Sequence, residues 1–219
     1  MTPTEPITAR PRPTPPIVDG IERGAAAAAL LLWLLIQIAS IALSAARVPL
    51  SAHFARPGEA LALPQLVLAQ MVCVSLLAPI LLRGWTSGLL TIVSAGPMLA
   101  LAAVLSGEFT VSAMRAWLAV ACWIAAVRCF VAALPSRFHL VIVAMANLLT
   151  LGGLVLAYAS AEYSDPRAFP FGPADAAMQF IGDAGSNAAW IWMIAPAVAG
   201  VISLVVSALR RSPNFTSAR

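Results

Sequence analysis

Residues 25–46 read AAAAALLLWLLIQIASIALSAA, a run without a single charged side chain. An α-helix rises about 1.5 Å per residue, so about 20 apolar residues cross the hydrocarbon core of a bilayer. Backbone groups in lipid must find their hydrogen bonds within the segment. The run therefore predicts a transmembrane helix. It exceeds the roughly 7–15 apolar residues of a cleaved signal peptide, so we expect the helix to be retained.

Further apolar runs of similar length follow along the chain. They cover about 61–82, 88–107, 116–134, 138–160 and 188–209, and their one charged residue is Arg128. The strands of a membrane β-barrel would be shorter and would alternate in polarity, which these runs do not. The sequence therefore predicts an all-α integral membrane protein, a bundle of six transmembrane helices.

The composition excludes most soluble classes. Apolar residues make up 61% of the 219 residues and charged residues 10%. A soluble domain has about 45–50% and about 25%, respectively. Membrane lipid is thus an expected partner, and nucleic acid is not.

The distribution of arginine predicts the orientation. With the N-terminus inside, the cytoplasmic segments contain Arg10, Arg12, Arg23, Arg83, Arg137, Arg210, Arg211 and Arg219. The outer loops then contain Arg47, Arg56 and Arg167. Basic residues concentrate in cytoplasmic loops. We therefore expect both termini in the cytoplasm of a bacterium and the helices in its inner (plasma) membrane.

The linkers between the predicted spans are short, apart from two on the outer side, 47–60 and 161–187. Residues 1–23 are rich in proline and predict a disordered cytoplasmic tail, and 211–219 form a short basic tail. The membrane domain covers 24–210, and its longest loop, 161–187, lies outside. Within this loop Pro173–Ile181 predicts a short helix, with proline at its first position. Its mixture of apolar and polar side chains favours a helix lying flat at the membrane interface.

The sequence contains few of the residues and motifs that are typical of enzyme active sites. No phosphate-binding loop, metal-ligand motif or nucleophile motif is present, and no carboxylate falls within a predicted span. His53 and His139 lie on opposite sides of the membrane in the predicted topology. We therefore predict no catalytic, cofactor-binding or metal-binding residue.

Polar residues inside the spans are the candidates for a functional or interhelical role: Arg128, Gln37, Gln70 and Asn147. Amide and hydroxyl side chains bond across helix contacts, and small residues let helices approach closely. In the last span, small residues recur four positions apart at Ala199, Ser203 and Ser207, and Gly200 lies beside Ala199. Helix packing and a substrate path both fit these patterns.

Arg128 is the most informative single residue. An arginine at the centre of a span costs about 2.5–3.5 kcal/mol. Three interpretations stay open: the side chain extends to the inner lipid phosphates, it bonds to another subunit or to Asn147 or Gln70, or it binds a substrate anion.

Prolines suggest an internal symmetry. If the helices form two inverted halves, the third and sixth correspond, and Pro97 and Pro196 fall near their centres. Interrupted helices at matched positions are typical of transporter sites. The two prolines are therefore candidate helix breaks.

Three functions remain. The leading hypothesis is a non-catalytic subunit or scaffold of a larger membrane complex, with other membrane subunits as partners. The first alternative is a permease or transporter component for a small or lipid-like solute, whose path Gln37, Gln70, Asn147 and Arg128 would line. The second is a membrane enzyme at the outer interface that uses Glu162, Asp165 or His53.

Overall fold

The computed structural model describes residues 16–45, 62–106, 110–156, 172–181 and 187–211. Every element in this part of the chain is helical. The elements are α1 (Pro16–Ala45), α2 (Ala62–Leu81), α3 (Trp85–Ser106), α4 (Thr110–Ala133), the 3-10 turn η1 (Ser136–Phe138), α5 (His139–Asn147), the π-helical turn η2 (Leu148–Gly152), α7 (Pro173–Ile181) and α8 (Asn187–Arg211). The described residues contain six helices long and apolar enough to cross a membrane, which indicates a multi-pass membrane protein.

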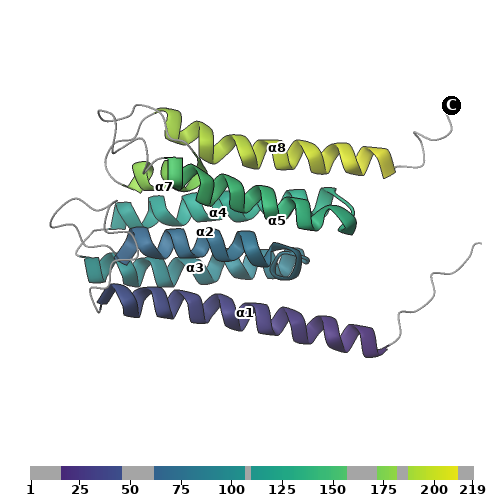
Figure 1. Cartoon of the computed structure of the whole chain (residues 1–219), viewed down its shortest axis with the longest axis horizontal. Coiled ribbons are helices and arrows are strands. Elements are labelled where there is room, and N and C mark those ends of the chain that lie inside the picture. Colours follow the sequence, from purple (N-terminus) through teal and green to yellow (C-terminus); the bar gives the residue numbers. More distant parts are fainter. Residues whose placement is uncertain (1–15, 46–61, 107–109, 157–171, 182–186, 212–219) are drawn as a thin grey trace, which may run out of the picture.

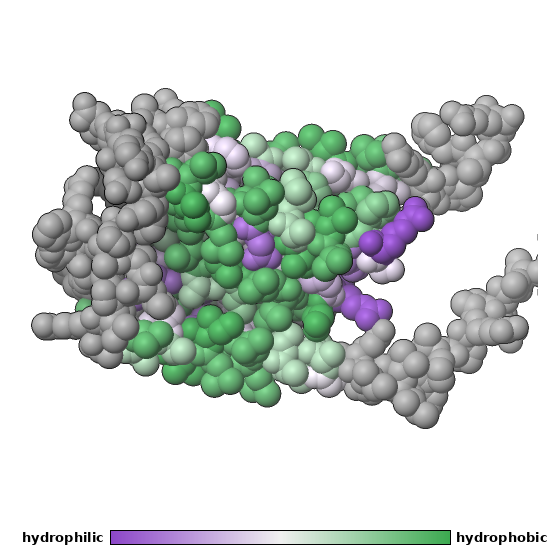
Figure 2. Space-filling model, in the orientation of Figure 1, coloured by the Kyte–Doolittle hydropathy of each residue, from purple (hydrophilic) through white to green (hydrophobic). Residues whose placement is uncertain are grey.

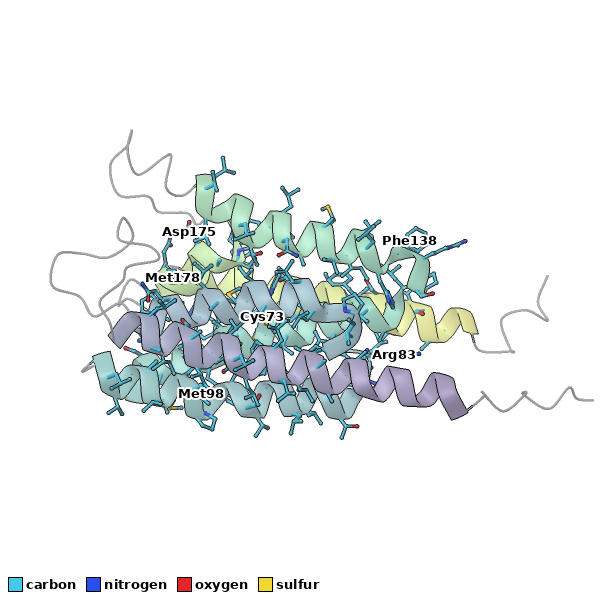
Figure 3. All side chains as sticks on the ribbon, turned by 60° about the horizontal axis from the view of Figure 1, so that its bottom comes forward. Cys73, Arg83, Met98, Phe138, Asp175 and Met178 are labelled. Atoms are coloured by element: carbon cyan, nitrogen blue, oxygen red, sulfur yellow. The ribbon has the colours of Figure 1, made fainter. Side chains whose placement is uncertain are left out.

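The long helices lie side by side along one axis and alternate in direction (Figure 1). The start of α1 and the end of α8 lie at the same end of the bundle, on opposite sides of it (Figure 1). Arg83 and Phe138 lie at this same end (Figure 3), and we call it the basic end. The opposite end, where α1 finishes and α8 begins, we call the loop end. Figure 2 shows a flank that is largely apolar between them, with strongly hydrophilic side chains at the basic end.

The first helix starts earlier than the apolar run. It begins at Pro16, inside the segment 1–23 that we expected to be a tail. Proline suits the first position of a helix, because its fixed φ is helical and its missing N–H would have no partner there. Residues 1–15 and 212–219 lie outside the described part of the chain.

The centre of the bundle is formed by α2 and α4. In the α4 span 61% of the residues are buried, against 11% in the α8 span. Side chains such as Val104 and Leu140 on the outer helices are more than three-quarters exposed. In water this surface would drive aggregation, whereas in lipid it is already in an apolar solvent.

The contact between α4 and α8 is the most extensive in the bundle, and it depends on Gly200. A Cβ at Gly200 would lie 2.9 Å from Cys129 Cβ and 3.0 Å from the Ala126 carbonyl oxygen. Of the small residues noted in this span, Gly200 makes the close approach to α4. Ala199, beside it, is exposed.

The helix Pro173–Ile181 has the predicted bounds, but its position differs from the expectation. As α7 it packs against α2, α4, α8 and η2, and most of its residues are buried. It is therefore enclosed by protein and does not lie flat at a lipid interface. Gly172 explains the fit: a Cβ there would lie 2.6 Å from the Leu149 carbonyl oxygen and 3.0 Å from Gly153 Cα.

Candidate functional site

Two of the predicted polar residues bond to each other in the interior. Gln70 Nε2 of α2 donates to Gln37 Oε1 of α1 at 2.7 Å, and both side chains are fully buried. Gln37 Nε2 donates in turn to the Trp33 carbonyl oxygen at 3.3 Å. Among the described residues, Gln70 Oε1 has no hydrogen-bond partner. The glutamine pair thus joins α1 to α2.

The same region extends to α3 through an indole. Trp33 Nε1 donates to Ser94 Oγ at 3.0 Å, and Ser94 Oγ donates to the Thr91 carbonyl oxygen at 3.1 Å. The sequence analysis missed Trp33 because tryptophan is counted as apolar. Its ring N–H needs a partner once it is buried, and a serine on a neighbouring helix is the signal that could have found it.

Helix α4 uses two further indoles in the same way. Trp123 Nε1 donates to Ser75 Oγ of α2 at 3.0 Å. Trp117 Nε1 donates to the Ile92 carbonyl oxygen of α3 at 2.9 Å. A Cβ on Gly96 would lie 3.5 Å from the Trp117 ring, so the missing side chain gives the indole room. Hydrogen bonds from side chains therefore join α1, α2, α3 and α4 to one another.

Pro97 and Pro196 do not interrupt their helices. Both α3 and α8 continue through the proline, so the structure shows no break at either candidate position. Proline removes one backbone donor, and neighbouring groups in a bundle can satisfy the freed carbonyl. The matched prolines thus give no support to the expected symmetry of broken helices.

Asn147 lies at the junction of α5 and η2 and bonds to its own helix. Its Nδ2 donates to the Val143 carbonyl oxygen at 2.8 Å. Thr150 Oγ1 donates to the Ala146 and Asn147 carbonyl oxygens at 2.9 and 3.2 Å. Within the described residues Asn147 Oδ1 is buried without a partner. These side-chain bonds to backbone carbonyls accompany the wider π-helical turn that follows.

Arg128 is buried near the basic end, with 6% of its surface exposed. Its guanidinium carbon lies 4.5 Å from the centroid of the Trp85 ring, a cation–π contact with the first residue of α3. The stem of the side chain passes Gly88, where a Cβ would lie 3.7 Å from Cγ and Cδ of Arg128. Over the described chain, Nε has no hydrogen-bond partner. The amide nitrogens of Gln70 and Asn147 bond to Gln37 Oε1 and the Val143 carbonyl oxygen instead.

At the loop end a second polar group lies inside the bundle. Asp175 of α7 is 7% exposed, and Gln179 Nε2 lies 3.5 Å from its Oδ1. Arg115 of α4 lies over the Phe180 ring at 5.8 Å, and Phe180 packs edge-on against Trp190 at 4.6 Å. The sequence placed Asp175 on a helix lying flat at the outer membrane interface, so the burial of this carboxylate between α7 and its neighbours was not predicted.

The candidates for an enzyme site, His53, Glu162 and Asp165, lie outside the described residues. Among the residues that were searched, no group of three or more His, Cys, Asp or Glu side chains is placed to hold a metal ion. Cys73, Cys122 and Cys129 are free thiols.

Comparisons with known proteins give no relative. No protein-family model, no curated protein and no solved structure matches this chain. Its function must therefore be argued from its own geometry.

Proposed function

We propose that this chain is a non-catalytic subunit or scaffold of a larger membrane complex, placed in the bacterial inner membrane with both termini in the cytoplasm. The observation that supports the proposal most strongly is the buried pair of Gln37 and Gln70. Their amides bond to each other at 2.7 Å. In a transporter such amides would bond to the solute, whereas here Gln70 Nε2 and both polar atoms of the Gln37 amide bond within the protein.

The orientation rests on the position of the arginines. The start of α1 and the end of α8 lie at the basic end (Figure 1), as do Arg83 and Phe138 (Figure 3), and Arg137 directly precedes Phe138. Since basic residues concentrate on the cytoplasmic side, this end is the cytoplasmic one. Cysteine tags at the two tails and in loop 161–187 test it: the tails should react only after the membrane is opened.

The outer helices supply the surface for partner subunits. Helix α8 packs against α4 and α7 and leaves Val198, Val201 and Val205 about half exposed. Lipid chains adapt to a larger side chain on such a face, whereas a packed protein interface does not.

The experiment compares the exposed faces of two helices in the native host. Tryptophan is introduced singly at Val198, Val201 and Val205 of α8, and at Leu31 and Leu35 of α1 as matched exposed positions. Complex size is measured after extraction in mild detergent. We expect the wild type to be recovered in one stoichiometric complex. Tryptophan substitutions on the exposed face of only one of the two helices, α8 or α1, should abolish that complex. A wild-type chain recovered as a stable monomer, with every variant unchanged, contradicts the proposal.

The transporter alternative has a direct test. Reconstituted vesicles are assayed for solute uptake with the wild type, Gln70→Leu and Arg128→Gln. We expect no uptake above protein-free vesicles. Uptake by the wild type that either substitution abolishes would replace the subunit proposal.

A further inference from the structure

The first turn of α3 has no side-chain cap. The Gly84 carbonyl oxygen accepts the first helical hydrogen bond, from Gly88 N–H at 3.1 Å, so Gly84 occupies the capping position. A residue there usually binds the free N–H groups of the first turn through a side-chain oxygen, and glycine has none. Ser87 Oγ bonds instead to the Gly84 backbone, at 3.2 Å from its nitrogen and 3.0 Å from its oxygen. The positive end of the helix dipole is thus left without this neutralisation.

A buried cation lies over the same turn. The Arg128 guanidinium stacks on Trp85, the first residue of α3, and the side chain is more than nine-tenths buried. Within the described part of the chain its Nε has no hydrogen-bond partner. A buried guanidinium whose Nε has no partner, beside the N-terminus of a helix, is an arrangement that can bind a phosphate group.

The location of this turn favours the phosphate of a lipid headgroup. Trp85 is 57% exposed, and it follows two residues after Arg83, which lies at the basic end (Figure 3). Arg83 precedes the turn and is also exposed. Tryptophan and arginine at the end of a membrane span lie at the level of the lipid headgroups, and basic pockets between membrane helices bind anionic headgroups.

We propose that the N-terminus of α3 and Arg128 together bind the phosphate of an anionic phospholipid. The guanidinium donates hydrogen bonds to the phosphate oxygens while Trp85 holds its plane. The backbone N–H groups of the first turn of α3 point to the same anion. This site does not depend on whether the chain is a subunit of a complex.

The test uses the full chain, purified in detergent and stripped of lipid. Binding of dioctanoyl phosphatidylglycerol is measured by native mass spectrometry, beside dioctanoyl phosphatidylcholine and inorganic phosphate. The test variant is Arg128→Gln. Its matched control is Arg137→Gln, because Arg137 also stacks on an aromatic ring at the basic end, 5.0 Å from Phe138, but is exposed.

We expect saturable binding of phosphatidylglycerol that falls at least about tenfold in Arg128→Gln, because a charge-assisted pair is lost, and less than about twofold in Arg137→Gln. A second variant, Ser87→Asp, places a carboxylate at the same turn and is expected to remove binding while stabilising the helix. Equal binding by the wild type, Arg128→Gln and Ser87→Asp overturns the proposal. Inorganic phosphate that binds as tightly as the lipid, and is lost in the same variants, overturns the lipid as its source.

Discussion

Two regions of the bundle hold their helices together by different means. Between α1, α2 and α3 the bonds run between polar side chains, from Gln70 to Gln37 and from Trp33 to Ser94. Between α4 and α8 the backbones approach closely at Gly200, which lies against Ala126 and Cys129. Both solve the same problem, since lipid gives no hydrophobic drive for helices to associate. The first region depends on matched hydrogen-bonding groups, whereas the second depends on the absence of a side chain at Gly200.

The largest effect is expected at the close contact. Gly200→Val places its Cβ against Cys129 and the Ala126 carbonyl oxygen, which is backbone and cannot rotate away. Overpacking of this kind costs about 1–3 kcal/mol, and we expect the free energy of unfolding to fall by that amount. Titration of the folded protein with a denaturing detergent measures it.

The control for this substitution is Gly24→Ala, since nothing lies within 4 Å of a Cβ there. It should leave the stability unchanged or slightly higher, because alanine favours the helix. Equal losses in the two variants would contradict the close packing of α4 and α8.

A second close approach gives a smaller effect. Gly172→Ala brings a methyl group 2.6 Å from the Leu149 carbonyl oxygen, so α7 must move away from η2. We expect a loss of about 1–2 kcal/mol, the lower part of the range for overpacking. Hydrogen exchange over Pro173–Ile181 should rise while that of α2 stays unchanged. Unchanged exchange in α7 would show that the helix does not depend on this contact.

The polar contact predicts a still smaller loss. Gln70→Leu leaves Gln37 without its partner amide in an apolar interior, and we expect a loss of about 1 kcal/mol. The double variant Gln37→Leu with Gln70→Leu removes both groups and should recover much of that loss. A double variant that loses the sum of the two single losses would argue against direct coupling.

The smallest effect is expected at Ser94→Ala. Trp33 Nε1 loses its acceptor, which is worth about 0.6 kcal/mol for an average interhelical bond in a membrane protein. Trp33 fluorescence resolved in a background of tryptophan-to-phenylalanine variants reports the change. A loss larger than that of Gly200→Val would reverse the order of the two contacts.

The spans were predictable from sequence, because length and apolarity alone decide whether a helix crosses lipid. The partners of the polar residues were not. Gln37 and Gln70 could be named, yet their pairing depends on how α1 and α2 rotate about their axes, which an apolar pattern on all sides leaves open. The burial of Asp175 was missed for a related reason: the amphipathic pattern of α7 fits a lipid interface as well as a protein groove.

Glycines account for most of the other structural features that could not be predicted from the sequence. Gly200 and Gly172 set the two closest approaches, but a glycine in a membrane helix or loop looks the same in sequence whether or not a neighbour touches it. Arg128 could be recognised as unusual, whereas Trp85 as its stacking partner could not, since the two residues are far apart in the chain.

The π-helical turn Leu148–Gly152 has a consequence for the rest of its span. Such a turn carries one residue more than a regular turn, so everything after it is displaced by about 100° around the axis relative to an uninterrupted α-helix. Leu154 is buried while its neighbours Val155 and Leu156 face outward. If the turn straightened into a regular helix without losing a residue, Leu154 would swing by this angle towards the surrounding acyl chains, whereas deletion of one residue within the turn would restore a regular helix and leave Leu154 facing inward.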